Sequence, residues 1–132
     1  MTELTEKTKH LANLLVCAAI DGHVGKRERW FIEKACARLF VRDDDRAAAE
    51  AAVAEHPKRL YHLRSPFDRR HCVEDVLVLG YIDGVMHIEE KKVVLELAKH
   101  LVISQADFDR LRSSAKRKAK DLNRELAREQ GT

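Results

Sequence analysis

The chain contains few of the residues that interrupt helices or build β-sheets. It has two prolines and five glycines, and aromatic residues make up only 5% of its 132 residues. Good helix formers such as Ala, Leu, Glu, Lys and Arg are abundant instead, and strand-like alternation is nearly absent. The composition therefore predicts an all-α protein, and the length suits one domain with its own core.

Long apolar runs and paired cysteines are also missing. No apolar run approaches the roughly 20 residues that span a bilayer, so we expect no transmembrane segment, while peripheral membrane contact stays open. The first residues lack the basic and then apolar regions of a signal peptide. Cys17, Cys36 and Cys72 are odd in number and form no Cys-x-x-Cys pair. We interpret them as reduced, buried thiols of a cytoplasmic protein.

Charge of one sign is not in large excess. The net charge is +3, which does not by itself indicate nucleic acid. Basic residues in the stretch 56–71 and at Lys116-Arg117-Lys118 could meet phosphates of nucleic acid or anionic lipid, but no aromatic residues interleave them for base stacking. We favour a solvated surface there and do not expect nucleic-acid binding. No nucleophile–base pair or phosphate loop is present either, so no catalytic residue is assigned and an enzyme is not expected.

Hydrophobic periodicity predicts a bundle of six or seven helices. The expected helices cover about residues 5–20, 26–39, 46–55, 68–82 and 88–101, and a last one begins at Ser104 with a capping box. The connector 56–71 is expected to be partly helical at 60–63. The charged C-terminal segment, about residues 116–132, is expected to be a helix or a tail, with residues 116–128 projecting into solvent or frayed. Gly80 inside a helix costs roughly 1 kcal/mol against Ala, which indicates close packing. An exposed Trp30 would be a candidate partner contact.

One motif occurs twice. Residues 21–28 and residues 83–90 both read Asp-Gly-x-apolar-x-x-x-Glu. Each copy follows an apolar, helix-like stretch and precedes an amphipathic one. The repetition predicts two related helix–turn–helix halves, at about residues 5–55 and 67–120, within one domain that covers residues 1–132. It also places four acidic residues at matching positions: Asp21, Glu28, Asp83 and Glu90.

The acidic residues have two interpretations, and local chemistry leaves both open. Carboxylates gathered at a sharp Asp-Gly turn are the oxygen ligands that hard cations prefer. His23 and His87 lie in the same turns and could add nitrogen ligands, which would favour zinc or another transition metal. Alternatively the glutamates are caps. If Gly25 and His87 are N-caps, then Glu28 and Glu90 reach back to the cap N–H groups.

The two turns resemble the TerB-like tellurite-resistance family, which includes the N-terminal region of a membrane-anchored DnaJ-like co-chaperone. In that family, Ala-Asp-Gly-x-apolar-x-x-x-Glu units lie between the helices of an all-α bundle with pseudo-two-fold repeats. The resemblance covers roughly residues 11–111, and residues 80–90 (GYIDGVMHIEE) are the closer copy. Ile20 and Ile82 replace the family's Ala, and Gly25 and His87 replace its small hydroxyl residue.

The resemblance implies a function as well as a TerB-like fold. It implies a site for a divalent metal ion of unknown identity, formed by Asp21, Glu28, Asp83 and Glu90. It further implies a non-enzymatic, stress-response role of the tellurite-resistance type, with a protein partner. Basic residues flank Glu28, so the metal role is better supported at Asp83 and Glu90. The alternative is a protein-interaction or co-chaperone-like scaffold in which the acids are only caps. One shared site or two, and the oligomeric state, stay open.

Overall fold

The computed structural model describes residues 4–20, 24–84 and 86–130. Within these ranges the chain forms six α-helices and no strand, so the predicted all-α class is confirmed. The helices are α1 (Glu6–Ala18), α2 (Lys26–Arg38), α3 (Asp43–Glu55), α4 (Pro66–Tyr81), α5 (Ile88–His100) and α6 (Gln105–Gln130).

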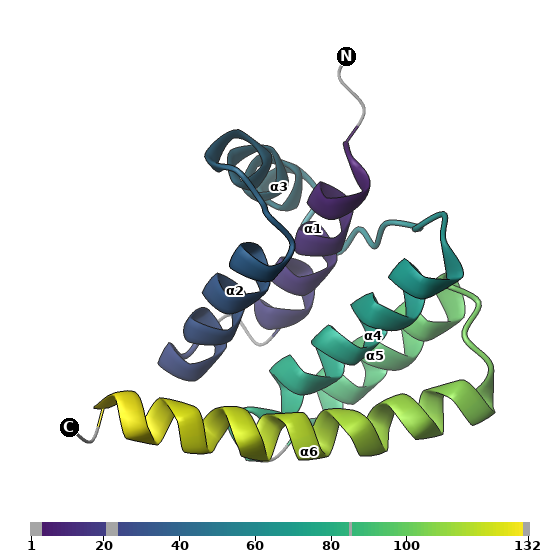
Figure 1. The fold of residues 1–132 in the computed structure, drawn as a ribbon. Helices are drawn as coiled ribbons and strands as arrows, with labels where there is room; N and C mark the ends of the chain where they lie inside the picture. The colour runs from purple at the N-terminus through teal and green to yellow at the C-terminus, as the bar shows by residue number, and fades with distance from the viewer. Residues whose placement is uncertain (1–3, 21–23, 85, 131–132) are drawn as a thin grey trace.

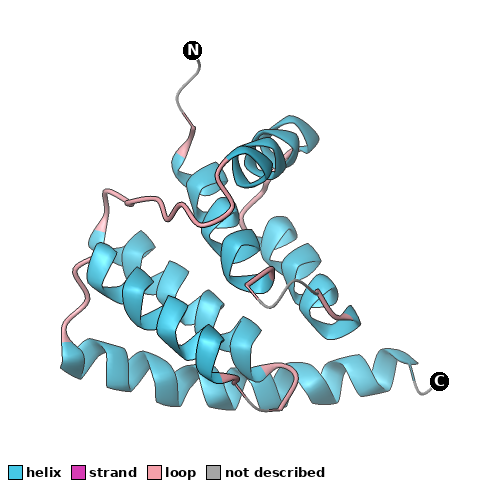
Figure 2. Ribbon diagram, turned by 180° about the vertical axis from the view of Figure 1, so that it is seen from behind, coloured by secondary structure: helices cyan, strands magenta, loops and turns pink. Residues whose placement is uncertain are grey.

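The helices pack in two groups that meet at α1 and α4. Helix α3 packs against α1, whereas α6 lies along α4 and α5 follows α4 closely (Figures 1 and 2). The core lies between these groups. Leu11 and Leu14 of α1, Leu77 of α4 and Leu97 of α5 are fully or almost fully buried in it. Because α1 and α4 join the two groups, the C-terminal ends of these two helices lie within one bundle.

Hydroxyl side chains fix the starts of three helices. Thr5 Oγ1 accepts from the Thr8 N–H at 3.3 Å before α1, and Ser65 Oγ accepts from the Asp68 N–H at 3.0 Å before α4. Ser104 Oγ accepts from the Asp107 N–H at 3.2 Å, which confirms the predicted start of α6. Helix α4 begins two residues before the predicted position, because Pro66 follows the Ser65 cap and its fixed φ suits a first helical residue.

Two boundaries and one segment differ from the sequence predictions. Helix α3 begins at Asp43 rather than at residue 46, because the Asp45 carboxylate accepts from the Arg42 N–H at 3.2 Å and so caps an earlier start. Helix α1 ends at Ala18, short of the predicted residue 20. The predicted helical turn at 60–63 is wrong: the Asn13 side chain bonds the N–H and the C=O of Tyr61, at 2.7 and 3.0 Å, and holds this backbone outside a helix.

The C-terminal segment is a packed helix as far as residue 130. The prediction that it projects into solvent or frays is wrong for these residues, because α6 runs unbroken from Gln105 to Gln130 and buries Leu126. Its far end is tied to α2, where Trp30 Nε1 donates to Glu129 Oε2 at 3.0 Å and Lys34 pairs with Glu125 at 2.6 Å (Figure 1). Trp30 is therefore half-buried and engaged within the chain rather than exposed as a partner contact.

Three further predictions can be compared with the structure. A Cβ on Gly80 would collide with the end of the Met86 side chain, which confirms a close approach at this glycine. All three cysteines are free and buried, as the sequence predicts. In the described part of the chain, no helix combines the length and the apolar character that a membrane span requires.

Candidate acidic site

The described residues of both motif copies lead into the start of a helix. Asp83 stands in the turn after α4, and Glu90 is the third residue of α5. Glu28 holds the matching place as the third residue of α2. The remaining predicted ligand, Asp21, lies outside the described residues, as does His23.

Both glutamates make the capping contact that the alternative interpretation predicts. Glu28 Oε1 accepts from the Gly25 N–H at 3.1 Å, and Glu90 Oε1 accepts from the His87 N–H at 3.4 Å. Each contact satisfies a backbone donor that the helix itself leaves unpaired. Gly25 and His87 are the N-caps, as expected. The capping contacts therefore exist, whatever else the carboxylates do.

Glu28 also faces the acidic residues of the second copy. Its side chain is buried, with 7% of the residue exposed, and its carboxyl group hydrogen-bonds that of Asp83. A Cβ added to Gly25 would lie 3.4 Å from Glu28 Oε1 and 3.9 Å from Asp83 Oδ2. Both carboxylates therefore border the same small space beside Gly25. The structure brings Glu28, Asp83 and Glu90 into one acidic cluster, and we use this name for these three residues.

The acidic cluster changes the protonation of Glu28. The pKa of Glu28 is raised from its ordinary value of 4.5 to about 7, and burial is the largest cause. The charge of Asp83, its hydrogen bond with Glu28 and the charge of Glu90 also raise this pKa, whereas the Gly25 N–H lowers it. The charged side chains that act most strongly on Glu28 are thus both acidic. The Glu28 carboxyl group is therefore partly protonated near neutral pH, and a positive charge beside it would lower its pKa.

Glu90 links the acidic cluster to helix α1. Burial first, and then the nearby Glu90 carboxylate, raise the pKa of the Cys17 thiol to about 12. Cys17 lies near the end of α1, whereas Glu90 belongs to α5. The surroundings of Glu90 therefore include both halves of the chain. Cys17 stays protonated at neutral pH, so it does not act as a thiolate ligand there.

The donor chemistry of the acidic cluster suits a hard cation. Its side chains offer carboxylate oxygens, and the charged side chains that act most strongly on Glu28 are acidic. Over the described residues, however, no three His, Cys, Asp or Glu side chains are placed to hold a metal ion by themselves. The cluster thus fits a cation in charge and in ligand type, but its described side chains do not complete a ligand set.

Sequence reasoning found the acidic residues but missed their neighbours. Gly25 was read only as a helix cap, although its missing side chain leaves the space between Glu28 and Asp83 open. The basic stretch at residues 116–118 was read as one surface, but helical geometry separates it. Lys118 pairs with Glu74, whereas Lys116 lies over the ring of Tyr81. The 3.6-residue period of a helix at this stretch could have shown the separation.

Neither protein-family models, nor curated proteins, nor solved structures yield a match to this chain. The resemblance to the TerB-like family therefore rests on the two turn motifs alone, and the roles that it implies for the acidic residues are proposals.

Proposed function

We propose that the chain is a non-enzymatic, TerB-like domain that binds a divalent metal ion and a protein partner in a stress response of the tellurite-resistance type. The observation that carries the metal role is the meeting of Glu28 with Asp83 and Glu90. These residues come from the two copies of one motif, and the proposal treats them as one shared site. Asp21, the remaining ligand of the proposal, lies outside the described residues.

The packing of the helices supports a repeated fold. The third helix of each half, α3 or α6, packs on the first helix of the same half, α1 or α4. In each half, the turn after the first helix leads to a helix that begins with a capping glutamate at its third position. A metal site shared by these two turns would take its ligands from the acidic residues of both halves.

A bound cation would relieve the repulsion within the acidic cluster. Glu28 and Asp83 would hold it beside Gly25, and Glu90 would contribute negative charge from α5. Oxygen ligands favour Ca²⁺, Mg²⁺ or Mn²⁺, and a histidine from either turn would shift the preference toward Zn²⁺. Because Glu28 lies on α2 and Asp83 follows α4, the ion would join the two halves and make their arrangement depend on its binding.

Thermal unfolding of ion-stripped protein tests the metal role. Wild type and Asp83→Asn/Glu90→Gln are melted with Ca²⁺, Mg²⁺, Mn²⁺ or Zn²⁺. An ion present at 100 times its Kd adds about 2.7 kcal/mol to the stability of wild type. We expect one ion to raise the Tm of wild type and to leave the double variant unchanged.

Asp45→Asn is the matched control for this experiment. Asp45 also caps a helix from its third position, but it belongs to α3 and not to the acidic cluster. Asp45→Asn should lower the stability and keep the full ion response. If no ion stabilises wild type, and the double variant is merely less stable in every buffer, the metal role is wrong.

The second candidate function is a protein-interaction or co-chaperone-like scaffold without a metal. The capping contacts of Glu28 and Glu90, at 3.1 and 3.4 Å, favour it because they explain both glutamates structurally. They leave unexplained why Glu28 is buried against Asp83. On this alternative, Glu90→Gln lowers the stability equally with and without added ions.

A further inference from the structure

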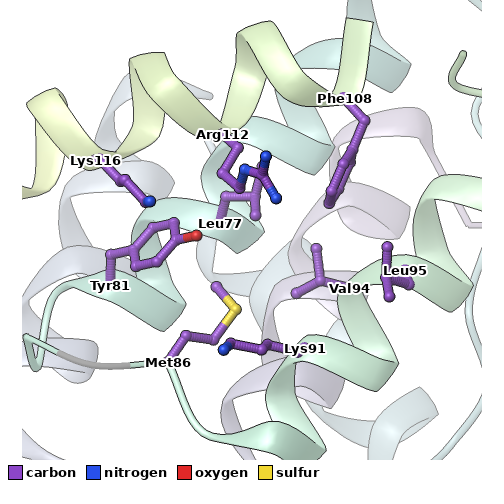
Figure 3. Close-up of a pocket in the computed structure, with 9 residues that line it drawn as sticks. All are labelled: Leu77, Tyr81, Met86, Lys91, Val94, Leu95, Phe108, Arg112 and Lys116. Atoms are coloured by element: carbon purple, nitrogen blue, oxygen red, sulfur yellow. The ribbon is translucent and has the colours of Figure 1, made fainter. Parts of the chain in front are cut away.

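A hollow of about 240 Å³ opens between α4, α5 and α6, and no residue of the acidic cluster lines it. Its apolar wall is formed by Leu77 of α4, Met86 of the turn, Val94 of α5 and Phe108 of α6. Figure 3 shows these side chains around one space. All four residues are buried, so the wall belongs to the core and is already formed.

Cationic and hydroxyl groups surround the same space. Arg112 and Lys116 reach it from α6, Lys91 reaches it from α5, and the phenol of Tyr81 points into it from α4 (Figure 3). Lys116 Nζ lies 5.4 Å from the centre of the Tyr81 ring. Three positive charges thus border one apolar hollow, and the phenol adds a hydrogen-bond donor or acceptor.

These positive charges have little compensation. Arg112 pairs with Asp109 at 3.4 Å, and both side chains are about half exposed. Lys91 and Lys116 form no ion pair with any described residue. A second hollow of about 470 Å³ adjoins the first, shares Tyr81, Met86, Lys91 and Lys116 with it, and adds Lys120. Like charges brought together repel one another, and an anion between them removes that cost.

The shape and the charge together select a class of ligand. Binding pockets for small molecules are mostly apolar with a few placed polar groups, and measure about 300–1,000 Å³. The first hollow is slightly smaller, so it suits a short apolar body rather than a drug-sized one. A carboxylate on that body would lie among Arg112, Lys116 and the Tyr81 hydroxyl, where charge-assisted hydrogen bonds are strongest.

We propose that this hollow binds a small amphipathic anion, with an apolar chain against Leu77, Val94 and Phe108 and an acid group at Arg112 and Lys116. The ligand carries one acid group on an apolar chain, and it is either a free medium-chain carboxylate or an anionic membrane lipid whose phosphate takes the place of the carboxylate. The proposal uses none of the carboxylates of the acidic cluster. It therefore stands or fails independently of metal binding.

Titration of the full chain with decanoate tests the proposal. Binding is measured by calorimetry and by the chemical shifts of the backbone amides in ¹⁵N-labelled protein. Decanoate should bind saturably and shift the amides of Tyr81, Val94, Phe108 and Arg112. Hexanoate should bind at least about tenfold more weakly, because it loses four methylene groups. Decyltrimethylammonium, which has the same chain but a positive head, should not bind in the hollow.

Two variants separate the charges of the hollow from the general charge of α6. Arg112→Gln/Lys116→Gln should weaken decanoate binding by about tenfold or more. Arg117→Gln removes one charge from an exposed position of the same helix that does not line the hollow, and it should bind as wild type does. All three positions are exposed, so unchanged thermal melts should show that each variant is folded.

Flotation with phosphatidylglycerol vesicles distinguishes a lipid source from a free acid. If wild type and Arg117→Gln bind the vesicles and the double variant does not, the ligand is a membrane lipid. If wild type binds decanoate but not the vesicles, the ligand is a free acid. The proposal is overturned if neither is bound. It is also overturned if the double variant binds them as wild type does, or if decyltrimethylammonium binds as well as decanoate.

Discussion

Helix α2 contacts α4 and the turn after α4 at two buried carboxylates. One of them, Asp75, faces a basic side chain, and the other, Glu28, faces acidic side chains. Near the end of α2, Arg38 pairs with Asp75 of α4. Near the start of α2, Glu28 faces Asp83. The two buried carboxylates are similarly covered, with 3% of Asp75 and 7% of Glu28 exposed. Their burial is alike, so the difference between them lies in their partners.

Asp75 is contacted from two helices by groups that suit a carboxylate, whereas Glu28 faces acids. His10 Nε2 of α1 lies 2.8 Å from Asp75 Oδ2, and Arg38 of α2 pairs with the same carboxylate. Asp75 thus joins three helices through a hydrogen bond with His10 and an ion pair with Arg38, as a structural group does. Glu28 is pressed against two other acids. Burying like charges does not stabilise a fold, and this contrast is the reason to look for a cation at the acidic cluster only.

The largest expected effect comes from breaking the Asp75 contact. Asp75→Asn removes the negative charge that pairs with Arg38 and leaves one side-chain oxygen as acceptor, so the contacts with His10 and Arg38 cannot both be kept. We expect a loss of about 3 kcal/mol in the free energy of unfolding, because a hydrogen bond to a charged group contributes about 1.5–3 kcal/mol and Arg38, whose side chain is 43% exposed, is solvated once it loses its partner. Urea unfolding at neutral pH measures this loss.

An exposed ion pair supplies the control for Asp75. Arg46 and Glu33 pair at 2.6 Å on the surface, where both side chains are more than a third exposed. Glu33→Gln should cost at most about 1 kcal/mol. If Asp75→Asn costs no more than Glu33→Gln, Asp75 is not the structural contact that we describe, and its contrast with Glu28 disappears.

A change of opposite sign is expected at Glu28. Its pKa is raised from 4.5 to about 7 in the folded chain, so the folded state binds more protons than the unfolded state between these values. The stability of ion-free wild type should therefore fall as the pH rises from about 4.5 to 7, and then level off. Glu28→Gln keeps the oxygen that accepts from Gly25 and removes this loss. At pH 8 it should be more stable than wild type by about 2 kcal/mol.

Urea unfolding at pH 5 and pH 8, in chelator, measures the effect at Glu28. The variant and the wild type should be close at pH 5 and separate at pH 8. Asp45→Asn serves as a comparison, because Asp45 is a capping acid outside the acidic cluster. A Glu28→Gln variant that is less stable than wild type at pH 8 would show that the carboxylate is only a cap.

The sequence predicts the fold well where the signal is local. The starts of α2, α5 and α6 follow from capping residues near the helix ends, and the predicted positions agree with the structure. The prediction of a helical turn at residues 60–63 is wrong for the opposite reason, because the contact that decides their structure is not local. Their backbone is bound by the Asn13 side chain, and nothing in the local pattern reveals a partner so far away along the chain.

The acidic cluster, too, could be predicted from the sequence only in its local features. Its positions could be read from the repeated motif, because Asp-Gly turns and capping glutamates have local signatures. That Glu28 would be buried against Asp83 could not be read, since it depends on how α2 packs beside the end of α4. Pairing of Asp75 with His10 and Arg38 was missed for this reason too: its residues are far apart in sequence and belong to no motif.

The smallest expected effect on stability comes from Gly25→Ala, which fills the space beside the acidic cluster without changing its charge. Gly25 has a φ of −72°, which alanine also adopts, so Gly25→Ala should cost less than about 1 kcal/mol through its weaker capping. Its methyl group would nevertheless stand 3.4 Å from Glu28 Oε1 and 3.9 Å from Asp83 Oδ2. A cation held by these oxygens needs that space, so the ion-dependent rise in Tm should shrink strongly while the ion-free melt changes little.

If Gly25→Ala responds to ions as wild type does, the ion does not lie between Glu28 and Asp83. The contrast between the two buried carboxylates would then reflect electrostatic strain in the fold and not a binding site.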